Sequence, residues 1–278
     1  MSGFGTVAVA GLGLIGGSAA RDLAAAGVRV LGWDRDTASV GAAVGEGIVS
    51  AALGPGFEGL EEADVFLAAV PVGAAPAVLQ AARPRLARAR LVTDTGSTKA
   101  SIAAAAERMG LGDRFVGAHP FAGDTRAGWE ASRTGLFTGK TVYLCPGPHS
   151  SPAAVTLARE LWTRIGGVPV DLGAEEHDRR VAWTSHLPQV VSTALAQALA
   201  ANGIAPAELG AGGQSVTRLA ASSAGVWLDI LRDNHAHVVE GLAAVEDRIR
   251  SIRAAIDADD AEAIRTAFLS ANRWHEAK

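Results

Sequence analysis

A glycine-rich turn near the start of the chain constrains the fold more than any other feature. Thr6–Ala10 is a short apolar run that predicts a buried strand, and Gly11-Leu12-Gly13-Leu14-Ile15-Gly16 follows it directly. In such a turn the first glycine permits the tight bend, the second lets the backbone approach a pyrophosphate, and the third lets the helix pack against the strand. A helix beginning near Leu14 then directs its free N–H groups at the anion. We therefore predict a dinucleotide site that includes Gly11, Gly13, Leu14, Ile15 and Gly16.

The end of the second predicted strand indicates which dinucleotide binds. Arg29–Trp33 is apolar and stops at Asp34, 23 residues after Gly11. A carboxylate at this place binds the ribose 2′-hydroxyl of NAD and repels the 2′-phosphate of NADP. The adjacent Arg35 is a complication, because a guanidinium group can accept that phosphate. We predict NAD as the cofactor, with NADP as the less favoured choice.

Strands and helices alternate through the rest of the first half. Strands are predicted at Asp64–Val70, Leu91–Asp94 and Phe115–Ala118, with helices at 37–45, at Ala74–Ala82 and from about 100 to Met109. This alternation is typical of a parallel sheet with helices on both faces. Ligands bind beyond the carboxyl ends of such strands, which adds Val70, Pro71 and Ser97 to the predicted cofactor site.

The strand pattern stops near Leu172. Thr141–Cys145 and Val168–Leu172 are the last predicted strands, around a helix at Pro152–Ile165. Long helices are predicted at Ala174–Ala201, with a kink at Pro188, and at Gly225–Ile256 and Asp259–Trp274, with shorter helices over 205–224. The predicted fold class is α/β: a Rossmann-like, doubly wound, mostly parallel sheet over 1–172, followed by an all-helical domain over 173–278.

Composition excludes several classes of protein. The 278 residues are 49% hydrophobic and 19% charged, with a net charge of −4 and no basic run that suggests nucleic acid. No apolar run approaches the ~20 residues of a membrane helix. Cys145 is the single cysteine, predicted to be a small core residue in a reducing compartment. The chain enters a strand within a few residues, without a signal peptide, so we expect a cytoplasmic protein. No cluster of Cys, His and Asp suggests a metal.

Polar residues at the predicted strand ends are candidates for chemistry. His119 follows a strand and precedes Pro120, where it is either a general base beside the nicotinamide or a histidine that hydrogen-bonds loop backbone. Ser97 is a candidate N-cap that can also face the cofactor and orient the base. Lys99 is either an anion contact or a solvated surface lysine.

The helical half offers further candidates. His186 lies beside Pro188 and lines a site or fills the core, and Arg218 binds a carboxylate bidentately or is an ordinary surface arginine. Trp227 lines a pocket or fills the core. The remaining histidines show no pattern that assigns them a partner: His149, His177, His235, His237 and His275.

Together these segments resemble the prephenate/arogenate dehydrogenase family of tyrosine biosynthesis. The resemblance covers nearly the whole chain in order, through Gly11–Ser18, Asp94–Lys99, Gly117–Gly123, Ser185–Pro188 and Thr217-Arg218. The His-Pro-x-x-Gly and Ser-His-Leu-Pro elements are rather specific to that family. The resemblance implies a nucleotide-binding domain followed by a helical domain that forms a homodimer, with the active site between the two.

The resemblance also implies roles for individual residues. His119 would take the proton from the ring hydroxyl as hydride leaves the same carbon, and loss of the ring carboxylate as CO2 would give an aromatic ring. Ser97 would orient His119 and the nicotinamide. Arg218 would pair with a substrate carboxylate, and His186 would hold the substrate from the helical side. Trp227 would lie near the pocket.

Two positions depart from the family pattern. Gln214 stands where many relatives have a basic residue, which puts one substrate contact in doubt. Asp124 stands where relatives often have Thr or Ser. An acid near the pocket would favour the ammonium of arogenate over the keto group of prephenate, unless Asp124 points elsewhere or pairs with Arg126.

Two other functions fit the architecture. Another two-domain β-hydroxyacid dehydrogenase or imine reductase would typically use a lysine of the helical domain, and this chain has no lysine from Ala174 to Asn272. A non-catalytic NAD-binding sensor is the remaining alternative.

Overall fold

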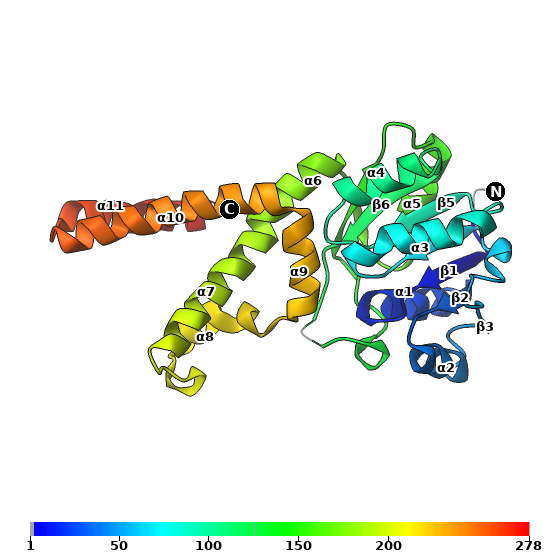
Figure 1. Ribbon diagram of the computed structural model, residues 1–278, viewed down its shortest axis with the longest axis horizontal. Helices are drawn as coiled ribbons and strands as arrows, with labels where there is room; N and C mark the ends of the chain where they lie inside the picture. Colours follow the sequence, from blue (N-terminus) through cyan, green and yellow to red (C-terminus); the bar gives the residue numbers. More distant parts are fainter. Residues whose placement is uncertain (1–2, 125, 278) are drawn as a thin grey trace.

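The computed structural model describes residues 3–124 and 126–277 and has a mixed sheet followed by a helical part (Figure 1). The strands of the sheet lie in the order β3-β2-β1-β4-β5-β6-β7-β8. Neighbouring strands are parallel except β6 and β7, which are antiparallel. The strands are β1 (Thr6–Ala10), β2 (Arg29–Trp33), β3 (Ala51–Ala52), β4 (Val65–Ala68), β5 (Leu91–Asp94), β6 (Phe115–Pro120), β7 (Thr141–Pro146) and β8 (Val168–Asp171).

Helices cover both faces of the sheet because alternate strand residues point to opposite faces. Val7 and Val9 of β1 pack in the same cluster as Leu23 and Trp162, which come from α1 (Leu14–Ala25) and α5 (Pro152–Arg164). The intervening alanines of β1 face a second cluster, to which α3 (Ala75–Ala82) and α4 (Ala100–Arg108) contribute. The predicted doubly wound sheet is confirmed.

The peripheral elements follow local sequence signals. Asp36 caps α2 (Thr37–Gly45) by accepting a hydrogen bond from the N–H of Ala38, and Ser151 caps α5 through Ala154. Pro152 occupies the first position of α5, where its missing N–H costs nothing. The 3-10 helices are η1 (Leu60–Glu62), η2 (Val72–Ala74), η3 (Arg83–Arg85), η4 (Trp129–Ala131), η6 (Pro206–Glu208) and η7 (Arg218–Ala221).

The first long helical stretch contains an irregular turn. It consists of α6 (Ala174–Val181), a π-helical segment η5 (Ala182–His186) and α7 (Leu187–Ala201). Pro188 has no N–H to donate to the carbonyl of Thr184, and the wider π turn lies at this point. The interruption that Pro188 predicts is therefore present, but it begins six residues before the proline rather than at it.

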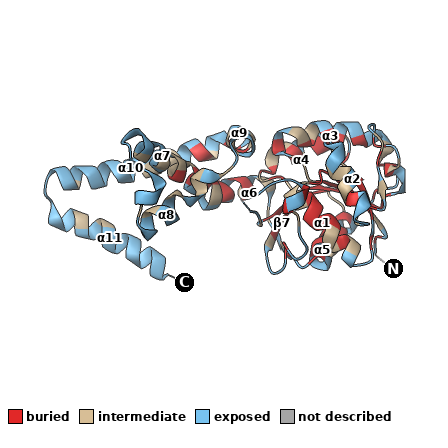
Figure 2. Ribbon diagram, turned by 90° about the horizontal axis from the view of Figure 1, so that it is seen from below, coloured by how far each residue is buried: buried red, intermediate tan, exposed pale blue. Residues whose placement is uncertain are grey.

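The structure has three helices where two were predicted, over Gly225–Ile256 and Asp259–Trp274. α8 (Ala211–Thr217) and η7 lead into α9 (Ala224–Asp233), and α10 (His235–Asp257) and α11 (Ala261–Glu276) follow. The prediction of one helix over Gly225–Ile256 was wrong because Asn234 breaks it. α10 and α11 project from the molecule as an arm, mostly exposed (Figure 2). Among the described residues, every helix is too short or too polar to span a lipid bilayer.

Candidate active site

A cavity of about 480 Å³ lies beyond the carboxyl ends of β1, β4 and β5. The glycine turn forms one wall and the loop after β6 forms another. The start of α9 closes the cavity from the helical side. The predicted residues Gly13, Leu14, Ile15, Val70, Pro71 and Ser97 all line it. From β1 the chain builds the sheet in one direction through β2 and β3, and it then continues on the other side of β1 with β4. Dinucleotides usually bind in the crevice at this switch of direction.

The three glycines of the turn occupy different environments. Gly11 has φ +93°, and a Cβ there would lie 2.2 Å from the carbonyl oxygen of Ala69. A Cβ on Gly16 would lie 1.9 Å from the carbonyl oxygen of Gly11. A Cβ on Gly13 would meet no protein atom within 4 Å, so the space in front of Gly13 belongs to the cavity. No side chain caps α1, and its first N–H groups are left for an anion such as a pyrophosphate.

Asp34 is held beside the glycine turn. Its Oδ2 accepts a hydrogen bond of 2.6 Å from the N–H of Leu12, and its Oδ1 accepts one of 2.8 Å from the N–H of Asp36. Each carboxylate oxygen keeps a further lone pair for a ribose hydroxyl. Arg35 is exposed next to it and makes no ion pair within the described chain. The residues present therefore fit a dinucleotide with a free 2′-hydroxyl.

Lys99 neither lines the cavity, where it could contact a bound anion, nor lies at the surface, so both sequence-based interpretations of it were wrong. Its side chain is 1% exposed, forms an ion pair with Asp94 and donates a 2.9 Å hydrogen bond to the carbonyl of Ala118. Asp94 is equally buried and also accepts from the N–H of Gly96. This pair ties the end of β5 to β6, one residue before His119.

Ser97 does not cap the following helix, which corrects that part of the prediction. α4 begins at Ala100, and the carboxylate of Asp178 caps it instead. Asp178 accepts hydrogen bonds of 2.8 and 2.9 Å from the N–H groups of Lys99 and Ala100. The cap comes from α6, so it also joins the helical part to the sheet. Ser97 is left to face the cavity.

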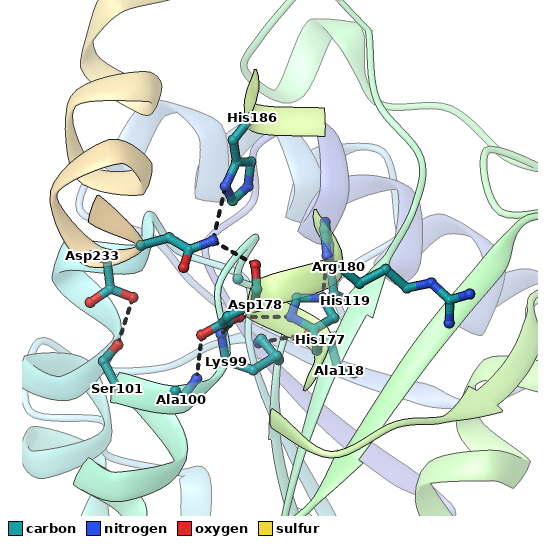
Figure 3. A network of polar contacts seen from close by, with 12 residues as sticks. Lys99, Ala100, Ser101, Ala118, His119, His177, Asp178, Arg180, His186 and Asp233 are labelled. Atoms are coloured by element: carbon teal, nitrogen blue, oxygen red, sulfur yellow. Dashed lines mark hydrogen bonds and ion pairs between the residues drawn. The ribbon is translucent and has the colours of Figure 1, made fainter. Parts of the chain in front are cut away.

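His119 belongs to a buried polar chain that runs from the sheet into α6 (Figure 3). Its Nδ1 lies 2.8 Å from Nε2 of His177, and Nδ1 of His177 lies 2.8 Å from Oδ1 of Asp178. Burial holds the pKa of His119 well below its usual value, and positive charge on His177, Lys99 and His186 would lower it further. His119 is therefore a neutral base at neutral pH, and its Nε2 has no hydrogen-bond partner in the described chain.

His186 accepts a hydrogen bond at its Nδ1 and presents a donor at its Nε2. Asn234 donates one amide hydrogen to the carbonyl of Asp178 at 2.7 Å and directs the other at Nδ1 of His186, 3.2 Å away. Burial lowers the pKa of His186 to about 4, so the ring is neutral. A neutral ring that accepts at Nδ1 carries its proton on Nε2. His186 is thus a hydrogen-bond donor, with its ring edge to face against Trp227 at 5.8 Å.

Trp227 and Asp124 both line the cavity, as predicted for a substrate site. Asp124 is engaged by two arginines, at 2.9 Å from Arg126 and 3.1 Å from Arg133. The hydrogen bond from Arg126 is the main reason why the pKa of Asp124 lies far below its usual range, and Arg133 adds to it. Asp124 therefore carries a full negative charge, and the pairing with Arg126 that the sequence left open is present.

Arg218 and Gln214 are not among the residues that line the cavity. Arg218 is exposed at the start of η7 and makes no ion pair with a described residue. Gln214 donates to the carbonyl of Leu209 at 2.9 Å, within its own turn. The η7 segment is held by Gln189 of α7, which donates to the carbonyl of Leu219 at 2.7 Å.

Sequence reasoning missed three residues of this site: His177, Asp178 and Asn234. His177 and Asp178 are adjacent in the chain and open the helical part, so a His-Asp pair at the domain junction was the available signal. Asn234 gave none, because it lies within an apparently continuous helical pattern. No group of His, Cys, Asp and Glu in the described chain is arranged to hold a metal ion.

Comparisons with known proteins agree with this geometry. The family model of the prephenate dehydrogenase nucleotide-binding domain matches residues 19–170, and that of the prephenate dehydrogenase dimerization domain matches 173–270. Cyclohexadienyl dehydrogenase of Zymomonas mobilis is 32% identical over 94% of this chain and 92% of its own length.

Two solved structures are similar over nearly the full chain. Prephenate dehydrogenase of Aquifex aeolicus, in complex with hydroxyphenyl propionate and NAD+, has a TM-score of 0.89 at 28% identity and covers 98% of each chain. Arogenate dehydrogenase of Synechocystis has a TM-score of 0.82 at 25% identity, over 98% of this chain and 99% of its own. The sheet, the helical part and both family models thus agree, and the chain belongs to the prephenate dehydrogenase family.

Proposed function

We propose that this protein catalyses the NAD-dependent oxidative decarboxylation of prephenate or arogenate. The family membership supports the reaction. The observation that carries it is a neutral, buried histidine, His119, at the carboxyl end of β6, directly before the loop that lines the cavity. The product is 4-hydroxyphenylpyruvate from prephenate or tyrosine from arogenate.

The cofactor is NAD. When bound, NAD would supply the nicotinamide ring that accepts hydride from the substrate carbon bearing the hydroxyl group. The protein binds it through the uncapped start of α1, the open space at Gly13 and the carboxylate of Asp34. The A. aeolicus relative was solved with NAD+. Arg35 does not change this assignment, because a 2′-phosphate would meet the negative charge of Asp34 first.

His119 acts as general base. It takes the proton of the ring hydroxyl while hydride leaves the same carbon, which relieves the positive charge that would develop there. The ring carboxylate then leaves as CO2, its bonding pair enters the ring, and His119 returns the proton to the phenolate oxygen. Formation of the aromatic ring and loss of CO2 make the reaction effectively irreversible.

Ser97, His186 and Trp227 hold the substrate and the base in place. Ser97 faces the cavity from the sheet side and orients His119 and the nicotinamide. His186 donates from Nε2 to a substrate oxygen on the helical side, because Asn234 occupies its other nitrogen. Trp227 packs on His186 and limits the cavity.

The family membership supports Arg218 as the partner of a substrate carboxylate, although its side chain does not line the cavity of the single chain. Its guanidinium group makes no ion pair within the described chain, which favours an external anion as its partner. Gln214, one helical turn before it, contributes at most a neutral contact. Asp124 lines the cavity, but its carboxylate is already paired with Arg126 and Arg133, so it favours the ammonium group of arogenate only weakly.

The helical part forms a homodimer. The family model that matches 173–270 describes a dimerization domain, and α10 and α11 carry large apolar side chains that are exposed in the single chain. An arm that is apolar and unpacked on this scale marks an interface. Light scattering after size exclusion tests this, and a monomer at micromolar concentration would contradict it. The apolar side chains are Val239, Ile249, Ile252, Ile256, Phe268, Leu269 and Trp274.

We place the boundary between the nucleotide-binding and helical domains at 172/173, where β8 has ended and α6 is about to begin. The reducing cytoplasm is the expected compartment, since the single cysteine of the sequence, Cys145, is a free buried thiol.

One assay tests the proposed function. Purified protein is given NAD or NADP with prephenate or arogenate, and formation of the reduced cofactor is followed by its absorbance at ~340 nm. We expect turnover with NAD that is lost in His119→Ala and kept in His149→Ala, a matched change of an exposed histidine. Binding of NAD without turnover of either substrate would favour the sensor alternative. Turnover of a β-hydroxyacid instead would favour the other dehydrogenases.

A further inference from the structure

Two residues that lie behind His119, His177 and Asp178, do not line the cavity. His177 and Asp178 come from α6, whereas His119 comes from β6, and the three side chains are linked by two contacts of 2.8 Å (Figure 3). His177 is fully buried and Asp178 is 4% exposed. A buried polar atom without a hydrogen-bond partner destabilises the folded protein. Each contact in this chain must therefore pair one donor with one acceptor, which fixes the position of every proton.

Asp178 fixes the direction of the first hydrogen bond. Its carboxylate already accepts the backbone N–H groups of Lys99 and Ala100, and an ionised carboxylate can only accept. Nδ1 of His177 therefore donates to Asp178. A neutral His177 then has a bare Nε2, which must accept the Nδ1–H of His119. A neutral His119 with its proton on Nδ1 carries its lone pair on Nε2.

We propose that His177 and Asp178 are positioning residues that fix the tautomer of His119 and stabilise its protonated form during turnover. Only the second role, stabilising protonated His119 during turnover, rests on the proposed function. When the ring hydroxyl gives its proton to Nε2 of His119, the O–H bond breaks and a new N–H bond forms. The positive charge of the imidazolium is then shared through Nδ1–H to His177, with the carboxylate of Asp178 behind it. The proton returns from Nε2 to the phenolate oxygen, so no proton needs to pass beyond His119.

The surroundings keep His177 neutral, as this assignment requires. Burial lowers the pKa of His177, and the hydrogen bond to Asp178 opposes this only in part. The other charged groups that face it are Lys99, which disfavours a second cation, and Asp94, which is neutralised by Lys99. From β7 the ring of Tyr143 packs edge to face on His177 at 5.5 Å and brings no charge.

The first experiment reads the tautomers directly. Protein labelled with 15N-histidine is studied by long-range 1H–15N correlation spectra without substrate or cofactor, and the signals are assigned by single substitutions. We expect Nδ1 to be protonated in His119 and His177, and Nε2 in His186. Protonation of His119 on Nε2 would overturn the inference. This readout needs no turnover, so it stands even if the proposed substrates are wrong.

The second experiment distinguishes two contributions of His177: its hydrogen-bond acceptor for Nδ1–H of His119, and its link to the charged carboxylate of Asp178. His177→Gln keeps an amide oxygen near the former Nε2 but loses the bond to Asp178, whereas His177→Leu removes both. We expect kcat to fall by about tenfold or less in His177→Gln and by at least about 100-fold in His177→Leu, because the latter frees His119 to adopt the wrong tautomer. KM should change by less than about threefold in both, because neither change touches the substrate. His149→Leu, an exposed histidine that also faces a carboxylate, is the matched control and should change neither constant.

A pH profile distinguishes positioning from general structural damage. Without the carboxylate behind it, protonated His119 is less stable, so its pKa falls and the acid limb of kcat/KM moves to lower pH in His177→Gln. Equal kcat in wild type and His177→Leu, or an acid limb that does not move in either variant, would overturn the role. If His177→Leu does not fold, judged by NAD binding and thermal unfolding, the His177→Gln profile and the wild-type spectra still decide the matter.

Discussion

The glycine turn allows a prediction that separates cofactor binding from folding. In Gly13→Ala the new methyl group meets no protein atom within 4 Å, and Gly13 has an ordinary φ of −71° that alanine adopts without strain. Alanine is a poorer N-cap than glycine, so the free energy of unfolding should fall by less than about 1 kcal/mol. The methyl group would, however, occupy the space in front of the N–H groups of α1, where the pyrophosphate is expected.

The cost to binding can be estimated from the hydrogen bonds that are lost. Displacing a phosphate from one charge-assisted backbone N–H costs about 1.5–3 kcal/mol. The Kd for NAD should therefore rise by roughly 10- to 150-fold in Gly13→Ala. The measurement is a calorimetric titration with NAD, together with thermal unfolding of the cofactor-free protein.

Gly16→Ala is the matched control with the opposite expectation. Its methyl group would lie 1.9 Å from the carbonyl oxygen of Gly11 and 2.8 Å from Cβ of Ala69, so α1 must move away from the sheet. Overpacking of this kind costs about 1–3 kcal/mol, which is roughly 2–12 °C in Tm for a chain of this size. A Gly13→Ala protein that binds NAD within about twofold of wild type would refute the placement of the pyrophosphate. A Tm loss equal to that of Gly16→Ala would refute the open space at Gly13.

Three further predictions concern the polar residues. Because burial lowers the pKa of His119 well below 6.5, kcat/KM should stay constant as the pH falls from 8 to 6.5 and decline only below that value, where the base is protonated; a pH profile with a midpoint at 6.5 or higher would contradict this. Lys99→Met should lower the free energy of unfolding by about 3–5 kcal/mol in urea denaturation, because it leaves the charge of Asp94 buried and unpaired, and Asp94→Asn in the same chain should restore part of the loss. Asp124→Asn should lower the ratio of kcat/KM for arogenate to that for prephenate by only about twofold, since Arg126 and Arg133 already pair with its carboxylate; a fall of more than roughly tenfold would show that the carboxylate is available to an ammonium group despite these pairs.

The features that sequence predicts well here are those whose causes are local. The turn from Gly11 to Gly16 needs only a preceding strand and a following helix, and both lie within the same short stretch of chain. His119 could be placed at a strand end because the run that precedes it, Phe115–Ala118, is apolar. The caps of α2 and α5 follow from Asp36 and Ser151 directly before them.

The errors arise where the partner is distant in sequence. Lys99 looks like a solvated residue until β6 provides a carbonyl group 19 residues later. Ser97 looks like a cap because the actual cap, Asp178, is 79 residues away from Lys99. Asn234 separates α9 from α10, and its side chain bonds Asp178 and His186, which lie 56 and 48 residues earlier in the chain. No local pattern encodes a pairing that depends on how α6 returns to the sheet.

The same long-range pairings make the base depend on the docking of the two halves. His119 is carried by the sheet, but the group that fixes its tautomer is carried by α6, which is held to α4 by the cap from Asp178. Asp233 of α9 adds a second polar tie, accepting a 2.8 Å hydrogen bond from the hydroxyl of Ser101 on α4. Any separation of the halves that breaks these ties also removes the partner from Nδ1 of His119 and exposes the ring to water. A histidine in water has no tautomer imposed on it and regains an ordinary pKa. The base is therefore prepared for its proton only while the helical part closes the cavity, which links binding between the halves to the chemical step.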